Sequence, residues 1–192
     1  MRKFAYLVLL AIPSIVMAHE DHSVEGVGFV VGLLHPILGF DHFLAMISVG
    51  IISYQIGGKA IWYVPATFVG VMVLGGIAGL ADIGLPLVES GIALSVLVLG
   101  LAIAANLKLS PMISLAFVAF FAIFHGYAHG LEMPEIASPY MYSLGFMMGT
   151  AVIHLLGVGV GGLASRFEDG PQVLRYVGAG IAGIGLHVLV GA

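Results

Sequence analysis

Two short motifs place histidines and carboxylates within long apolar stretches of the chain. The first is HPILGFDH, at residues 35–42, and the second is FHGYAHGLE, at residues 124–132. An ionisable side chain at the centre of a bilayer costs on the order of 3 kcal/mol even on the lenient insertion scale, so it is a functional hypothesis by default. Imidazole and carboxylate groups are ligands for divalent transition metals, and their clustering predicts a path for a metal ion.

Helical geometry decides which of these side chains can act together. At roughly 100° per residue, the rotation about the helix axis from His35 to His42 is about 20° short of two full turns. A straight helix therefore carries both residues on one stripe. In the second motif, His125, His129 and Glu132 are related by i, i+4 and i+7 and share another stripe. If the two helices pack together, the stripes form a short ladder of donors along which an ion can pass.

The predicted metal-binding residues come from both motifs. They are His35, Asp41, His42, His125, His129 and Glu132. Asp41 is either a buried structural partner of His42 or the carboxylate that fixes the tautomer of a metal-bound histidine. His154 and His187 stand alone in later apolar stretches, where a hydrogen bond between helices is the simpler interpretation and metal binding is the alternative.

The composition is that of an integral membrane protein. Hydrophobic residues make up 60% of the chain, charged residues make up 8%, and the mean hydropathy is +1.14. The net charge of -4 says little about soluble partners, and we predict no binding to nucleic acid. Since there are no cysteines, nitrogen and oxygen atoms are the strong metal donors, and the nine methionine thioethers are weak ones.

Residues 1–18 resemble a secretory signal peptide. Two basic residues precede an apolar stretch that ends in small or aliphatic residues at Ala18. Cleavage there would leave residues 19–25 as a periplasmic leader; an uncleaved signal anchor is the alternative. In the leader, His19 and His22 could capture a metal ion together with the free amine, or could belong to a merely solvated polar segment.

Residues 26–192 are predicted to form a compact, Gly-rich bundle of six transmembrane helices. The apolar runs are at 26–56, 60–80, 87–105, 111–131, 140–164 and 173–191. The first run is long for a straight span, so we expect a tilt or a break near Pro36. Many of the 28 glycines recur at four-residue spacing, which lets helix backbones approach closely in lipid.

The basic residues predict the orientation of these spans. With the N-terminus outside, every Lys and Arg beyond the signal falls in a cytoplasmic loop, namely Lys59, Lys108, Arg166 and Arg175. Both termini should therefore be periplasmic in a multi-pass protein of the inner membrane. The opposite loops are acidic and could concentrate cations.

The two motifs resemble those of the HupE/UreJ family of bacterial membrane proteins, and the similarity extends along essentially the whole chain. The resemblance implies a nickel or cobalt permease, or an accessory protein, that supplies hydrogenase or urease maturation. The ion would then be the transported substrate, and no cofactor would be permanently bound. The resemblance also implies that the six motif residues named above are the functional ones.

Other classes of protein fit the histidines less well. The pair His125 and His129 resembles one histidine box of a membrane di-iron desaturase, but the further boxes are missing. A haem protein would need facing histidines on two helices. We therefore predict a protein that is not an enzyme. The lack of a GxxxxGK motif predicts transport that is facilitated or is coupled to an ion gradient or to the membrane potential. A metal-binding accessory protein that does not translocate is the main alternative.

Overall fold

The structure is a computed structural model that describes residues 24–107, 109–134 and 138–191. Its helices are, in order, α2 (Val24–Leu38), α3 (Phe40–Ile56), α4 (Ala60–Leu80), α5 (Val88–Ala104), α6 (Pro111–Leu131), α7 (Pro139–Ala164) and α8 (Gly170–Gly191). Within those ranges there is no strand, which confirms the predicted all-α class. The predicted signal peptide and the leader residues His19 and His22 lie outside the described residues.

The helices have the length and apolar surface of a multi-pass membrane protein. Four of them, α4, α6, α7 and α8, are long and apolar enough to cross a membrane, and the bent pair α2 and α3 could form a fifth span. Large apolar side chains such as Trp62, Leu74 and Leu155 are exposed on the outside of the bundle, where lipid can cover them. The apolar helix α5 has 17 residues, the lower end of the usual range, so the count of six spans stays a prediction.

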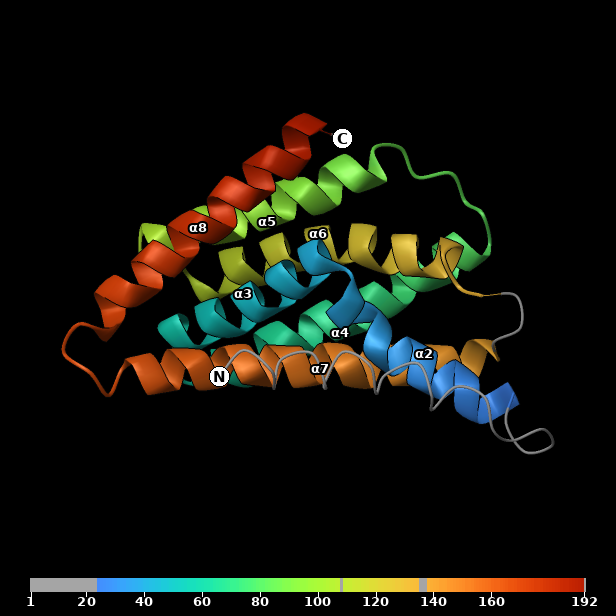
Figure 1. Ribbon diagram of the computed structural model, residues 1–192, viewed down its shortest axis with the longest axis horizontal. Coiled ribbons are helices and arrows are strands. Elements are labelled where there is room, and N and C mark those ends of the chain that lie inside the picture. The colour runs from blue at the N-terminus through green and yellow to red at the C-terminus, as the bar shows by residue number, and fades with distance from the viewer. Residues whose placement is uncertain (1–23, 108, 135–137, 192) are drawn as a thin grey trace, which may run out of the picture.

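The first predicted span is broken at Gly39 (Figure 1). Helix α2 continues through Pro36 to Leu38, and α3 then leaves at an angle of 80°. The proline ring removes one helical hydrogen bond from the last turn of α2, and Gly39 has an extended conformation with φ -76° and ψ 102°. The break was expected, but the single stripe for His35 and His42 is wrong, because these residues lie on different helices.

Glycines bring the backbones of paired helices into contact. Gly75 and Gly79 of α4 face the backbone of α6, and Gly126 and Gly130 of α6 face that of α4. A β-carbon at Gly126 would collide with the carbonyl oxygen of Met72. Similar contacts join α2 to α7, α3 to α7 and α5 to α8, so the predicted role of glycine in helix packing is confirmed for these pairs.

Helix α3 lies at the centre of the bundle and contacts all six other described helices (Figure 1). The order of the glycine contacts along each chain segment shows that α4 runs parallel to α6, and that α2 and α3 run parallel to α7. Helix α8 runs antiparallel to α5. As a result, the last turn of α6, the first turns of α7 and the bend between α2 and α3 meet at one end of the bundle.

The basic residues of the described ranges gather at the other end. Lys59 precedes α4, Arg166 follows α7, and Arg175 lies near the start of α8, where its Nε donates to the carbonyl oxygen that ends α5 (2.9 Å). A hydrogen bond of 2.7 Å between the hydroxyls of Tyr54 and Ser165 joins the last turn of α3 to the end of α7. The two ends of the bundle therefore differ in charge, as the sequence predicts.

Candidate metal centre

The outermost part of the site is formed by His35, His129 and Glu132. Glu132 follows the last residue of α6, and its Oε2 lies 3.0 Å from Nε2 of His35 on α2. The same oxygen lies 3.8 Å from Nδ1 of His129, one turn earlier on α6. The imidazole rings of His35 and His129 are in edge contact, with centroids 4.7 Å apart. Two segments nearly a hundred residues apart in sequence thus share one carboxylate.

These three side chains come close to the spacing that a transition metal needs. Each offers one nitrogen or oxygen atom, and the three atoms lie within 4.8 Å of one another. Ligands at about 2.1 Å from a shared ion lie at most about 4.2 Å apart, so movements of less than about 1 Å would complete the arrangement. One carboxylate and two imidazoles suit nickel, cobalt, zinc or copper.

The charge of Glu132 favours a cation at this position. The hydrogen bond with His35 lowers the pKa of Glu132 below its ordinary value, although partial burial acts in the opposite direction. The carboxylate is therefore ionised at neutral pH. Its side chain is 49% exposed, so it can meet an ion that still carries part of its hydration shell.

His42 is the next residue of the site toward the interior, and Asp41 orients its ring. Asp41 Oδ1 accepts from the backbone N–H of His42 at 2.8 Å and lies 2.9 Å from Nδ1 of the same ring. With the Nδ1 proton on this hydrogen bond, the lone pair is on Nε2, which is buried and has no hydrogen-bond partner among the described residues. This geometry fits both roles considered for Asp41, a structural partner of His42 and the carboxylate that fixes a ligand's tautomer.

The rings of His129, His42 and His125 then form a continuous file. The centroids of His129 and His42 are 4.3 Å apart, and those of His42 and His125 are 4.8 Å apart. Ser95 Oγ donates to the carbonyl oxygen of Ile92 at 2.6 Å, so it can accept from Nε2–H of His125 at 2.9 Å. That arrangement leaves the lone pair on Nδ1 of His125, which is also buried without a partner in the described part of the chain.

The mouth of this file is exposed, whereas the histidines further inward are buried. The side chain of Glu132 is 49% exposed and that of His35 is 27% exposed, whereas that of His129 is only 4% exposed. His42 is also buried, and His125 is not exposed at all. The file therefore leads from an exposed mouth to a buried interior.

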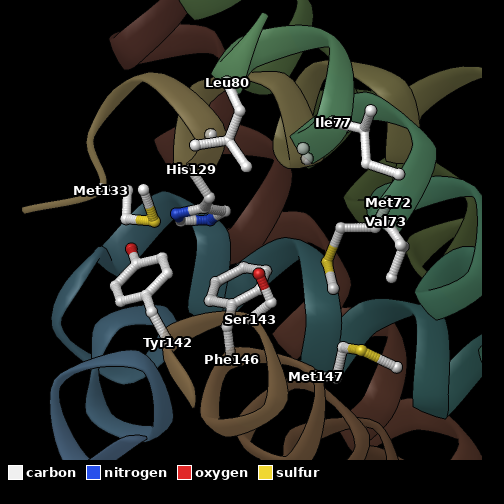
Figure 2. A pocket seen from close by; sticks show the side chains of 13 residues that line it. Met72, Val73, Ile77, Leu80, His129, Met133, Tyr142, Ser143, Phe146 and Met147 are labelled. Atoms are coloured by element: carbon white, nitrogen blue, oxygen red, sulfur yellow. The ribbon is translucent and has the colours of Figure 1, made fainter. Parts of the chain in front are cut away.

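A pocket between α4, α6 and α7 opens beside His129 (Figure 2). It holds about 60 Å³ of water-sized space, more than the roughly 10–15 Å³ that one water molecule needs. The imidazole of His129 lies at one end, near the side chains of Met133 and Tyr142, and Met72 and Met147 lie on the opposite side (Figure 2). Thioethers are soft, weak ligands, so the pocket can accommodate a metal ion near His129 without trapping it.

All six motif residues lie in this one group, whereas the two solitary histidines lie outside it, in different surroundings. His154 lies inside the bundle beyond His125, whereas His187 is exposed on α8 and joins none of the described ring contacts. Sequence reasoning missed Ser95 and Phe68, which contact His125 from α5 and α4. A serine within an apolar helix is a weak signal, and nothing in the sequence distinguishes Phe68 from other core aromatics.

Fold and site together define a class of protein: a multi-pass helical membrane protein with a file of imidazoles and carboxylates in its interior. The family described as HupE / UreJ protein matches residues 7–188, and the chain belongs to this family. The resemblance predicted from the two motifs is therefore confirmed.

Among curated relatives, the chain is similar to Protein HupE of Rhizobium leguminosarum bv. viciae. The two are 42% identical over 186 residues, which cover 96% of this chain and 95% of that protein. No solved structure matches the chain.

Proposed function

We propose that this protein is a permease that carries nickel or cobalt across the bacterial inner membrane. The observation that carries the proposal is the file of side chains from Glu132 to His125, along which several ring nitrogens have no hydrogen-bond partner among the described residues. A storage or structural site needs one closed set of ligands. A file of incomplete sites instead lets an ion move from one donor to the next, because no single position binds it too tightly.

Family membership supports the choice of metal. Imidazole with carboxylate accepts several divalent ions, and an undiscriminating site of this type would favour copper over nickel. The HupE/UreJ family is associated with nickel or cobalt supply to hydrogenase and urease maturation, so these are the proposed cargo and the proposed purpose. The ion is a transported substrate in this scheme, and no reaction is catalysed.

Charge and helix direction support a topology of six spans with both termini in the periplasm. The parallel pairs formed by α4 with α6 and by α2 and α3 with α7 are those expected if successive spans alternate in direction. With the basic end in the cytoplasm, the mouth at Glu132 faces the periplasm. An inward potential of about 100 mV is worth roughly 4.6 kcal/mol for a divalent cation, which would drive uptake without ATP.

Uptake of radiolabelled nickel into proteoliposomes tests the proposal. His42→Ala and His129→Ala should reduce the uptake rate to background, because each removes a ring from the middle of the file. His187→Ala is the matched control and should transport like the unchanged protein, since it removes an exposed histidine from α8. Normal uptake by folded His42→Ala and His129→Ala proteins would contradict the proposal.

The same measurement separates the permease from a metal-binding accessory protein. An accessory protein would bind nickel through the same residues but would not deliver it to the liposome interior. A bis-histidine haem protein is disfavoured by the ring contacts of 4.3–4.8 Å along the file, which leave no space for a flat macrocycle between successive imidazoles.

A further inference from the structure

His154 is a buried histidine whose ring has no described hydrogen-bond partner. It lies on α7, its exposure is 0%, and neither Nδ1 nor Nε2 is paired within the described residues. Among these residues, no side chain makes the hydrogen bond between helices that the sequence favoured for His154. Burial of two unpaired polar atoms is destabilising, so the position requires an explanation other than packing.

The register of α7 places His154 deeper than the histidine file. Near the start of this helix, the rings of Tyr142 and Phe146 contact His35 at the mouth, with centroid separations of 5.9 Å and 6.3 Å. His154 follows Tyr142 by twelve residues, which at roughly 1.5 Å per residue corresponds to about 18 Å along the helix axis. His154 is therefore in the half of α7 (Pro139–Ala164) that is nearer Arg166.

Phe68 of α4 connects the end of the file to His154. Its ring centroid is 5.5 Å from that of His125 and 5.1 Å from that of His154, and the side chain is fully buried. One aromatic ring therefore contacts both imidazoles. An ion that moves from one imidazole to the other therefore passes beside this ring.

We infer that His154 is a further metal-binding side chain, which receives the ion from His125 past the ring of Phe68. The inference rests on the proposed function and extends the file into the basic half of the bundle. The step is a ligand exchange: a metal–nitrogen bond to His125 breaks and one to His154 forms, with no change in the charge of the ion. Both imidazoles are neutral donors, as metal ligation requires.

The first test is the kinetics of nickel uptake in proteoliposomes. His154→Ala leaves the mouth and His42 in place, so the concentration for half-maximal uptake should change less than about twofold while the maximal rate falls about tenfold or more. His187→Ala again serves as the control histidine. A maximal rate for folded His154→Ala equal to that of the unchanged protein would overturn the inference.

The second test detects the metal at position 154 without measuring transport. The chain has no cysteine, so His154→Cys introduces its only thiol. Thiolate is a strong ligand for cobalt, and its ligation produces a charge-transfer absorption that imidazole ligands do not. Adding cobalt chloride to the purified full chain should produce this band in His154→Cys but not in His187→Cys. Absence of the band from folded His154→Cys at saturating cobalt would overturn the inference.

Together the two tests distinguish failure of this inference from failure of the proposed function. If nickel uptake requires His42 while His154→Ala transports normally and His154→Cys has no band, the permease stands and His154 is not a ligand. If the unchanged protein does not transport but His154→Cys has the cobalt band, the permease fails while the inner metal site stands.

Discussion

At the scale of single residues, the file contains imidazole rings that a hydrogen bond orients and one that no described hydrogen bond orients. His42 is oriented by Asp41 through Nδ1, and His125 is oriented by Ser95 through Nε2. His129, between the mouth and His42, has no hydrogen bond to either ring nitrogen within the described part of the chain. A ring held on one side presents its lone pair in a fixed direction, whereas neither nitrogen of His129 is engaged by a described residue, so this combination suits transfer better than storage.

Asp41→Asn tests the orienting carboxylate. Asparagine keeps the shape of the side chain but removes the charge that supports the Nδ1–H tautomer of His42, so cobalt affinity should fall by about 10–100-fold. Cobalt titration of the purified protein, followed by its absorption spectrum, measures the effect. Asp82→Asn is the matched control: Asp82 is exposed after α4 and has φ 49°, a conformation that asparagine tolerates. Equal affinities for the two variants would refute this role of Asp41.

At the scale of helices, the position of the file depends on close backbone contact. His125 and His129 flank Gly126, whose missing side chain lets α6 lie against α4. The bend at Gly39 lets α2 and α3 approach the same stretch of α6 from different directions, so His35 and His42 both reach His129. A straight first span could not make these two contacts with one ring.

Gly126→Ala should destabilise the α4 and α6 pair. The added methyl group would meet a backbone carbonyl, which cannot move as a flexible side chain can, and the cost should be about 1–3 kcal/mol. Thermal unfolding in detergent, with cobalt binding measured alongside, reports both the stability and the geometry of the file. Gly183→Ala on α8 adds the same group in open space and should lower neither the stability nor cobalt binding. If both alanine variants melt at the same temperature, close packing at Gly126 is not a major source of stability.

At the scale of the whole molecule, the two ends of the bundle carry different charge. Glu132 lies at the end where exposure of the file is greatest, whereas Lys59, Arg166 and Arg175 lie at the other. A negative mouth attracts cations, and a basic opposite end is the one that stays in the cytoplasm. The difference in charge between the two ends of the bundle therefore agrees with the proposed direction of transport.

Fusions at the C-terminus test this orientation. If the predicted six spans and a periplasmic C-terminus are correct, an alkaline phosphatase fusion should be active, because that enzyme folds outside the cytoplasm. A green fluorescent protein fusion at the same position should be dark. Both signals are normalised to the amount of fusion protein in the membrane. An inactive phosphatase fusion together with a fluorescent green fluorescent protein fusion would place the C-terminus in the cytoplasm and rule out the six-span topology.

The sequence by itself determined the class of protein and the group of motif residues. Apolar runs require burial in lipid wherever they fold, and the spacing of His125, His129 and Glu132 puts them on one side of any α-helix. Gly spacing likewise identified the surfaces on which helices approach. These conclusions depend on composition and on the period of one regular element, which are properties of the chain segment alone.

Only the tertiary structure decided how the segments meet. The bend at Gly39, the contact of Ser95 with His125 and the place of Phe68 beside His154 all depend on the register between helices far apart in sequence. That register is set by side-chain and glycine packing across several helices at once. The periodicity of a single helix does not specify which helices pack against it or in which register. For this reason His154 and His187 look alike in the sequence, yet one lies beyond the end of the histidine file and the other is exposed on α8.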